Sequence, residues 1–262
     1  MKKALKISLT VLFWIAIWYL AVFLYSLRYK MDLTGNAIFP YPHQVIFKLS
    51  ILLLKLDFYL ATVSSLIRIV LATLFAVIMG VLFAILCSKF DFLNFILKPF
   101  LITIKSVPVT VFVFILYLLI FDFTSMLITF LMVFPIVFGN VYEGIKNIDK
   151  DMLEVCHTYK IPFLKRIKSL YLPTVMPYFV SALITSIGLA WKAGIAAEAL
   201  CPPDNSMGLY ISLAKQNIEN DELFAWALTL VIINIIFEMA LKKLIKHSFK
   251  KWLPVEVKNE NK

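Results

Sequence analysis

Charged residues are scarce in this 262-residue chain, where they make up 16% of the sequence, whereas 61% is hydrophobic. A soluble domain is typically about a quarter charged and about half apolar. So much apolar surface could not be buried in a water-soluble core of this size, and the same excess excludes a disordered chain. The seven glycines exclude a collagen-like or glycine-rich architecture. We therefore expect an integral membrane protein.

Cysteine and histidine are also rare, with three residues each. No CxxC pair occurs, and the topology predicted below puts no two of Cys87, Cys156 and Cys201 together in an oxidising compartment. We expect these cysteines to be packing residues. The histidines lack the spacing of a zinc site, and no nucleophile-elbow or metalloprotease motif is present. The sequence predicts neither a cofactor nor a bound metal.

Long uncharged runs predict an all-α integral membrane protein with residues 1–262 in a single transmembrane domain. A span needs about 20 apolar residues, and its backbone groups must be satisfied within the segment, which favours helices. The first run is too long for a cleavable signal and lacks a small-x-small site, so we expect it to be retained as a span. The six predicted spans are residues 5–27, 60–87, 105–121, 124–143, 174–198 and 223–242.

The basic residues are distributed unevenly around these spans. If the N-terminus is cytoplasmic, most lysines and arginines fall in the inner segments, including residues 144–172 and the tail from Lys242. The positive-inside rule therefore predicts that both termini are cytoplasmic. The formal net charge of +10 has the same explanation, so we expect no nucleic-acid partner. Residues 28–58, which contain Pro40 and Pro42, are predicted to form an external loop with a short surface helix.

The inner segment 144–172 is long for a connection inside a membrane domain, and such loops are usually functional. Asp151 and Glu154 have the spacing of a capping box, which predicts a helix with Asp151 as its N-cap. The helix is expected to end before Pro162, because proline disfavours the helical conformation of the residue before it. Its apolar face, at helical spacing, comprises Met152, Val155, Cys156 and Tyr159.

A second short helix is predicted over residues 163–171, with Leu164 on its apolar side and Lys165 and Lys168 largely on the other. Basic residues in that position suit an anionic lipid surface. Two interpretations of the whole segment stay open on spacing alone. It is either an ordinary amphipathic surface helix between two spans, or a helix-break-helix that docks into the groove of a partner.

Several fragments, in order and at compatible spacing, resemble the permeases of ABC importers. Residues 140–173 are similar to the cytoplasmic EAA loop of that family, with Glu154 at the position of its glutamate and Pro173 at its closing proline. Further resemblances are Ser64-Ser65-Leu66-Ile67-Arg68, Lys105-Ser106-Val107-Pro108, Trp191-Lys192, Ala197-Glu198 and Met207-Gly208-Leu209-Tyr210. The combination is similar to the nitrate, sulfonate, taurine and pyrimidine-precursor branch.

The sequence departs from the family pattern at three positions of the loop. Val155 and Cys156 replace two alanines, and Lys160 replaces a glycine. A left-handed turn at Lys160 would be strained, because a side chain disfavours that conformation.

The resemblance implies the fold of a type I ABC importer permease in a bacterial inner membrane. The loop would be the coupling helix, seated in a cleft of a separate ATP-binding subunit, with Glu154 as its register anchor. The implied ATPase-coupling residues are Met152, Glu154, Val155, Cys156, Tyr159 and Lys160. The implied partners are two ATP-binding subunits, an external solute-binding protein and a second permease subunit, identical or different.

The chain itself is not expected to be an enzyme. Its nearest approach to a phosphate-binding loop, Gly139 to Gly144, has its lysine one place late and lacks the following serine or threonine. ATP hydrolysis is therefore expected on the separate subunit.

Three ionisable residues, Arg68, Lys192 and Glu198, lie within predicted spans. Such groups are expensive in a bilayer and by default suggest function near a translocation pathway. Arg68 and Glu198 both lie toward the outer side, where they could pair. The open interpretations are a structural ion pair that orients helices, a direct substrate contact, and side chains that extend to the interface.

The sequence thus predicts the transmembrane permease subunit of an ATP-driven importer for a small solute. Nitrate, sulfonates, taurine and a thiamine or pyrimidine precursor are the candidates that the resemblance supplies. An ATP-independent carrier or channel is the alternative, in which the inner loop would be merely structural. A membrane-embedded enzyme would need polar catalytic residues clustered at one depth, whereas the charges here are dispersed.

Overall fold

A computed structural model describes residues 2–28 and 39–252, and every secondary-structure element in that part of the chain is helical. The predicted all-α class is confirmed. The elements are α1 (Lys2–Arg28), α2 (Pro42–Leu52), α3 (Leu56–Lys89), α4 (Asp91–Ser106), α5 (Val109–Ile120), η1 (Phe121–Phe123), α6 (Thr124–Lys146), α7 (Lys150–Thr158), α8 (Phe163–Arg166), η2 (Ile167–Tyr171), α9 (Leu172–Leu200), α10 (Met207–Gln216), α11 (Asn220–Ser248) and η3 (Lys250–Trp252).

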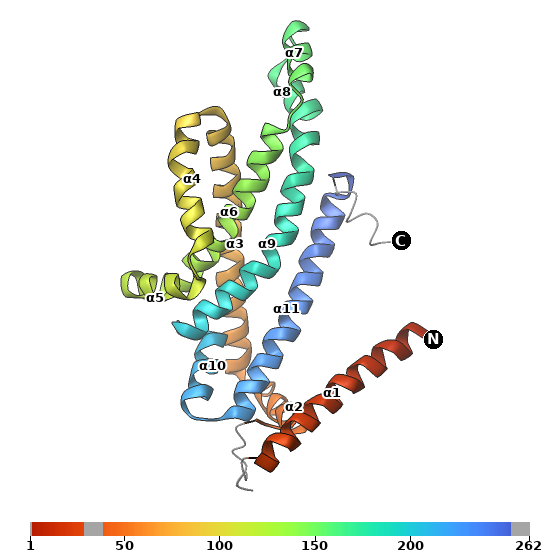
Figure 1. Cartoon of the computed structure of the whole chain (residues 1–262), viewed down its shortest axis with the longest axis vertical. Coiled ribbons are helices and arrows are strands. Elements are labelled where there is room, and N and C mark those ends of the chain that lie inside the picture. Colours follow the sequence, from red (N-terminus) through yellow and green to blue (C-terminus); the bar gives the residue numbers. More distant parts are fainter. Residues whose placement is uncertain (1, 29–38, 253–262) are drawn as a thin grey trace.

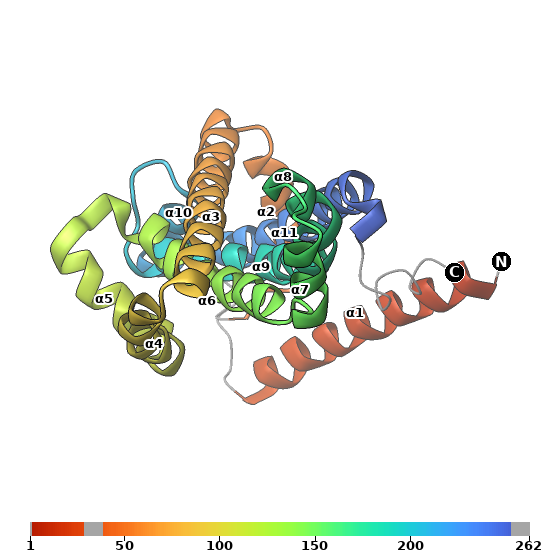
Figure 2. The same ribbon diagram turned by 90° about the horizontal axis from the view of Figure 1, so that it is seen from above.

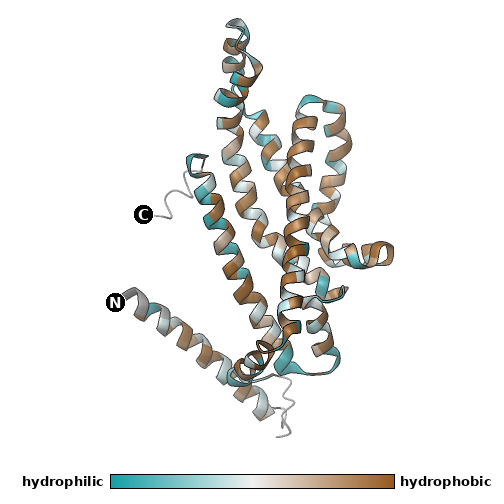
Figure 3. Ribbon diagram, turned by 180° about the vertical axis from the view of Figure 1, so that it is seen from behind, coloured by the Kyte–Doolittle hydropathy of each residue, from teal (hydrophilic) through white to brown (hydrophobic). Residues whose placement is uncertain are grey.

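The helices α3, α6, α9 and α11 run roughly along the long axis of the molecule (Figure 1). Helices α7 and α8 project at one end of this bundle, and α2 and α10 lie toward the other. We call these two ends the α7 end and the α10 end. Helix α1 diverges from the bundle, as the view from above shows (Figure 2). Hydrophobic residues dominate the long helices, and hydrophilic ones gather mainly at the two ends (Figure 3).

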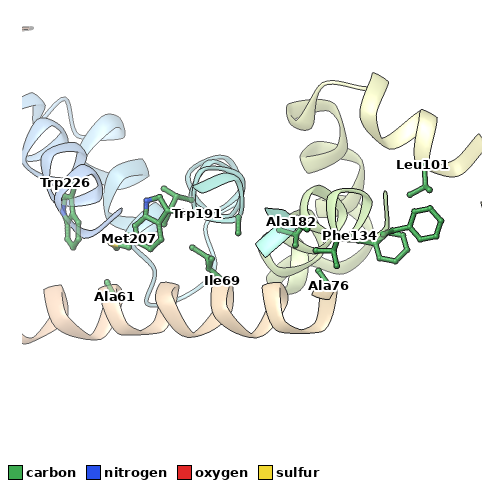
Figure 4. Close-up of a cluster of buried hydrophobic side chains, with 14 of the residues drawn as sticks. Ala61, Ile69, Ala76, Leu101, Phe134, Ala182, Trp191, Met207 and Trp226 are labelled. Atoms are coloured by element: carbon green, nitrogen blue, oxygen red, sulfur yellow. The ribbon is translucent and has the colours of Figure 1, made fainter. Parts of the chain in front are cut away.

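The core forms where α3 crosses α6 and α9. Helix α3 turns a row of small residues, including Ala61, Ala76 and Gly80, toward its neighbours (Figure 4). A Cβ atom at Gly80 would lie 2.9 Å from the side chain of Val137 in α6. One at Gly194 in α9 would lie 2.7 Å from Ile69. Close packing of this kind holds helices together in lipid, where the hydrophobic effect does not drive them together.

Five helical stretches of the described residues are long and apolar enough to cross a membrane. They are Ser8–Leu27, Leu56–Lys89, Val109–Lys146, Phe163–Leu200 and Asn220–Ser248. A membrane protein with several spans is thus confirmed, whereas the predicted number of six is not. The predicted third and fourth spans fall largely within one of these stretches.

The predicted third span, 105–121, is not a continuous helix. Helix α4 ends at Ser106, and α5 begins at Val109 after Pro108. Proline lacks an amide hydrogen and disfavours the helical conformation at Val107, which is extended at ψ 132°. The 12 residues of α5 reach only about 18 Å, and they leave the bundle sideways (Figure 1). The hydropathy of this run indicated an apolar segment, but it did not indicate that the chain changes direction at Pro108.

The surface helix expected within residues 28–58 corresponds to α2, and residues 29–38 of that predicted loop lie outside the described part of the chain. Lys48 joins α2 to the start of α11, with its Nζ atom 3.1 Å from a carboxylate oxygen of Glu222. Burial lowers the pKa of Lys48, but the hydrogen bond to Glu222 and the negative charges of Asp221, Glu222 and Glu219 outweigh it, so that the pKa is raised overall.

Candidate functional site

Helix α7 begins two residues earlier than the capping box predicts. The N-cap is Asp149, not Asp151, and its carboxylate accepts a hydrogen bond of 2.9 Å from the amide of Asp151. Asp149 has the extended backbone of a cap, at φ −60° and ψ 121°. Asp151 instead lies in the first turn, where a negative charge is favourable near the positive end of the helix dipole.

The C-terminus of α7 is closed by a Schellman motif. The amide of Ile161 donates to the carbonyl of Cys156 at 3.0 Å, and the amide of Lys160 donates to the carbonyl of His157 at 3.1 Å. Lys160 has φ 48°, in the left-handed region. The position where the family pattern has glycine therefore does adopt the conformation that glycine favours. A side chain there costs about 1 kcal/mol.

A group of large apolar side chains is exposed on α7 and α8. We call it the tip surface, and it consists of Met152, Val155, Tyr159, Phe163 and Leu164. Tyr159 is 76% exposed. The tip surface lies on the part of the molecule that projects beyond the other helices (Figure 1). Exposed apolar patches often mark interaction sites, which makes the tip surface a candidate for one.

Two further predicted coupling residues, Glu154 and Cys156, differ in their exposure. Glu154 is exposed on α7, next to the tip surface. Cys156 is only 7% exposed and points inward, so it is not part of that surface. The spacing groups Cys156 with Met152, Val155 and Tyr159, but the spacing alone cannot show how far a face extends into the fold.

The tip is connected firmly to two spans. Residues 163–200 form a helical stretch in which α8 leads into α9 through η2, a π-helical turn. Such turns are rare and are often found at functional sites. On the other side, the side-chain amide of Asn147 donates to the hydroxyl of Tyr178 at 3.0 Å, which joins the end of α6 to α9. A displacement of the tip would therefore act directly on α6 and α9.

A second candidate site lies in the bundle and contains two of the three predicted intramembrane charges. Glu198 in α9 is completely buried, and Ser65 in α3 donates a hydrogen bond of 2.6 Å to its Oε2 atom. The Nη1 atom of Arg68 lies 3.5 Å from Oε1 of Glu198. Arg68 is about 18 Å along α3 from Leu56, well inside a helix that is long enough to span a membrane.

The same network holds the turn between α9 and α10. Arg68 donates through Nη2 to the carbonyl of Asp204 at 2.7 Å, and Ser65 accepts from the amide of Met207 at 3.0 Å. The amide of Gly208 donates to Glu198. These bonds from Ser65, Arg68 and Glu198 fix the turn against α3 and the end of α9.

Only glycine fits at position 208. A Cβ atom there would lie 2.2 Å from the carbonyl carbon of Glu198.

Ser206 caps α10 by accepting a hydrogen bond from the amide of Leu209 at 3.0 Å. The first amides of α10 are thus occupied by side chains of this chain, and the negative charge of Glu198 stands at the N-terminus of the helix, where it is favourable.

Sequence analysis named Arg68 and Glu198 as a candidate pair but missed the roles of Ser65, Asp204 and Gly208. Ser65 and Gly208 both stand in the motifs that carry the family resemblance. Ser65 stands in the same motif as Arg68, which was the available signal, but a single sequence does not show which helices cross.

The third predicted charge, Lys192, is not part of this network. It is exposed on α9, about 12 Å before the end of that helix at Leu200. Among the described residues, no carboxylate lies within 4 Å of its ammonium group. The same part of the chain contains no group of three His, Cys, Asp or Glu residues that could hold a metal ion.

These features define a multi-pass helical membrane protein with exposed apolar side chains on a projecting end. Residues 72–249 match the family of binding-protein-dependent transport system inner membrane components, and the chain belongs to this family of ABC transporter permeases.

The chain is similar along most of its length to two named permeases. It is 23% identical to a putative aliphatic sulfonates transport permease of Bacillus subtilis, over 85% of this chain and 80% of the relative. It is also 23% identical to a taurine transport system permease of Escherichia coli, over 82% of this chain and 80% of the relative. A nitrate import permease of Synechococcus elongatus is 28% identical over 56% of this chain and 53% of the relative.

Proposed function

We propose that this chain is the permease subunit of an ATP-driven importer, and that it couples solute movement to a separate ATP-binding subunit through α7. The observation that carries this proposal is the tip surface. Its apolar side chains are exposed beyond the bundle, and its base is joined to both α6 and α9. A surface with these connections can transmit the movement of a bound partner to the spans.

The residues of the tip take distinct roles in this proposal. Met152, Val155 and Tyr159 supply the apolar contact, and the exposed carboxylate of Glu154 fixes the register by pairing with a cation of the partner. Lys160 ends the coupling helix at its left-handed turn. The buried Cys156 supports α7 from within and does not contact the partner.

The α7 end is the cytoplasmic end in this proposal, in a bacterial inner membrane. Helices α1 and α11 run in opposite directions, so that the start of α1 and the end of α11 both point toward the α7 end (Figure 1). Lysines are frequent at that end, as in the last turns of α3, α6 and α11. Their enrichment agrees with the positive-inside rule and with two cytoplasmic termini.

The complete importer would contain two permease subunits, identical or different, and two ATP-binding subunits. An external solute-binding protein would dock at the α10 end. The solute would be a small molecule with an acidic oxygen group, in keeping with the sulfonates, taurine and nitrate that the names of its relatives state.

We assign the network around Glu198 a structural role within this function. Both carboxylate oxygens have partners within the chain, Ser65 at Oε2 and Arg68 at Oε1, and Glu198 is completely buried, so a passing solute would not reach it. The network would hold the outer turn against α3 and α9 while the tip moves at the other end.

Purification of the tagged chain from its native membrane tests the coupling role. We expect an ATP-binding subunit to copurify, and we expect Tyr159→Asp to abolish this because a charge would be buried in the apolar contact. The matched control is Ile236→Asn on α11, whose side chain is 61% exposed outside the tip surface and which should retain the subunit.

A weakly held partner would be captured through Tyr159→Cys, since the thiol would be exposed there, in contrast to Cys156. If no ATP-binding subunit is recovered with cross-linking either, the coupling role is wrong. An ATP-independent carrier or channel would then be the better description.

A further inference from the structure

Helix α9 exposes an unusual set of residues for a membrane span. Between its end residues, Leu172 and Leu200, the exposed side chains are Thr185, Lys192 and Ala196, and none is a large hydrophobic residue. Away from the helix ends, the exposed side chains of α3 and α11 are instead mostly large and apolar, such as Leu71 in α3 and Ile235 in α11. Lipid-facing surfaces have the composition of α3 and α11. The exposed face of α9 therefore faces water or protein in the membrane.

The three exposed residues share one side of the helix. Lys192 follows Thr185 by two helical turns, and Ala196 follows Lys192 by one, so the spacing matches the period of 3.6 residues. Trp191, next to Lys192, is buried in the core (Figure 4). Lys192 thus lies on a side of α9 whose other two exposed residues, Thr185 and Ala196, have small side chains.

The ammonium group of Lys192 is poorly placed to reach either membrane surface along α9. The nearer end of α9 is at Leu200, but side chains in a helix tilt toward its N-terminus, which here is away from that end. The other end, at Leu172, is about 30 Å distant. Arg68 lies in the same half of the bundle but is already paired with Glu198, so it is neutralised within the chain.

We propose that Lys192 is the anion-binding residue of the translocation pathway, and that the acidic oxygen group of the passing solute is its counter-ion. This inference rests on the proposed importer function. A lysine ammonium is a compact point charge with three rotatable donors, which suits brief contact with a small oxyanion in different orientations. The exposed face of α9 would line the water-filled path past this residue.

Charge-selective thiol labelling tests the inference in the full chain within its native complex. The three native cysteines are buried and are replaced by alanine. Ala196→Cys then places one thiol a single turn from Lys192. We compare its reaction rates with two methanethiosulfonates of similar size, one carrying a sulfonate and the other a trimethylammonium group.

The anionic reagent should react faster, and adding Lys192→Gln should lower the anion-to-cation rate ratio by roughly tenfold. A change of this order is expected for a unit charge about 6 Å away in a partly aqueous environment. Lys192→Arg should preserve the ratio. Sodium nitrate should slow the anionic reagent more than sodium chloride does at equal ionic strength, and only while Lys192 is present.

The control and the opposing outcomes separate the possible causes. Ile236→Cys, on a lipid-like face of α11, should react with neither reagent. If Ala196→Cys also reacts with neither, the α9 face is covered by protein or lipid and the inference is wrong. If it reacts equally with both reagents and Lys192→Gln changes nothing, the face is wet but the charge does not act on anions. In both cases copurification of the ATP-binding subunit reports separately whether the proposed importer function stands.

Discussion

The network around Glu198 and the tip surface on α7 and α8 differ in whether their energetically unfavourable groups find partners within the chain. At Glu198, a carboxylate that is expensive to bury is surrounded by donors from Ser65, Arg68 and Gly208. At the tip, apolar side chains such as that of Tyr159 are left exposed beyond the bundle. The first arrangement is complete within one chain, whereas the second has exposed contacts still to make.

This difference shows where a single chain of an assembly is self-sufficient. A charge in the membrane region must be neutralised when the helices pack, because the desolvation cost is otherwise several kcal/mol. An exposed apolar surface outside the bundle costs far less and can be held open for a partner. Substitutions in the network should therefore change stability, and those at the tip should change assembly.

The largest loss of stability is expected from Glu198→Ala. It leaves Arg68, Ser65 and the amide of Gly208 without their acceptor, and removing one member of a buried pair typically costs about 3–5 kcal/mol. Thermal unfolding of the detergent-solubilised protein measures the effect. Glu154→Ala, at an exposed carboxylate, is the control and should leave the midpoint nearly unchanged. Equal shifts for the two variants would contradict the contrast between the regions.

Gly208→Ala should come next, at a cost of about 1–3 kcal/mol. The new methyl group would overlap the backbone of Glu198, so the turn and α10 must shift. Gly139→Ala in α6 is the matched control, because nothing lies within 4 Å of its added Cβ atom. There the change should stabilise the helix by about 0.5–1 kcal/mol. The unfolding midpoint should fall in Gly208→Ala and rise in Gly139→Ala. Equal decreases in the two variants would argue against close contact at Gly208.

Lys160→Gly should raise stability by about 1 kcal/mol, since it removes the side chain from a left-handed turn at φ 48°. Lys165→Gly is the comparison, because it lies in the short helix α8 and should lower stability by a similar amount. Hydrogen exchange of the amides in α7 is the most direct measurement. Faster exchange in Lys160→Gly would show that the strain at this position is relieved in some other way.

The smallest effect on stability is expected from Tyr159→Ala, within about 0.5 kcal/mol of the native protein, because the side chain is exposed. Its effect should appear instead as weaker retention of the ATP-binding subunit. Thermal unfolding and copurification on the same preparation check both parts. A large drop in the unfolding midpoint would mean that Tyr159 supports the fold, which would remove the contrast between the two regions.

Local features were predictable from the sequence. Five helical stretches are recognised by their length of uncharged residues, and the end of α7 by Pro162 and the family pattern at Lys160. The predicted N-cap of α7, Asp151, was wrong by two residues, because the structure has Asp149 at that position. The apolar run around 105–121 was visible, but its bend at Pro108 was not, because hydropathy records composition and not direction.

By itself, then, the amino-acid sequence determines a helical membrane protein with an amphipathic helix between two spans, since chain length, hydropathy and capping act between near neighbours. Only the tertiary structure decides which charges meet. Ser65 and Glu198 are 133 residues apart and pair because α3 crosses α9, aided by small residues at the crossing. The burial of Cys156 on α7 is likewise a result of tertiary packing. So is the position of Lys192, which has no carboxylate within 4 Å among the described residues. Such outcomes depend on how packed helices rotate about their axes, which no local pattern specifies.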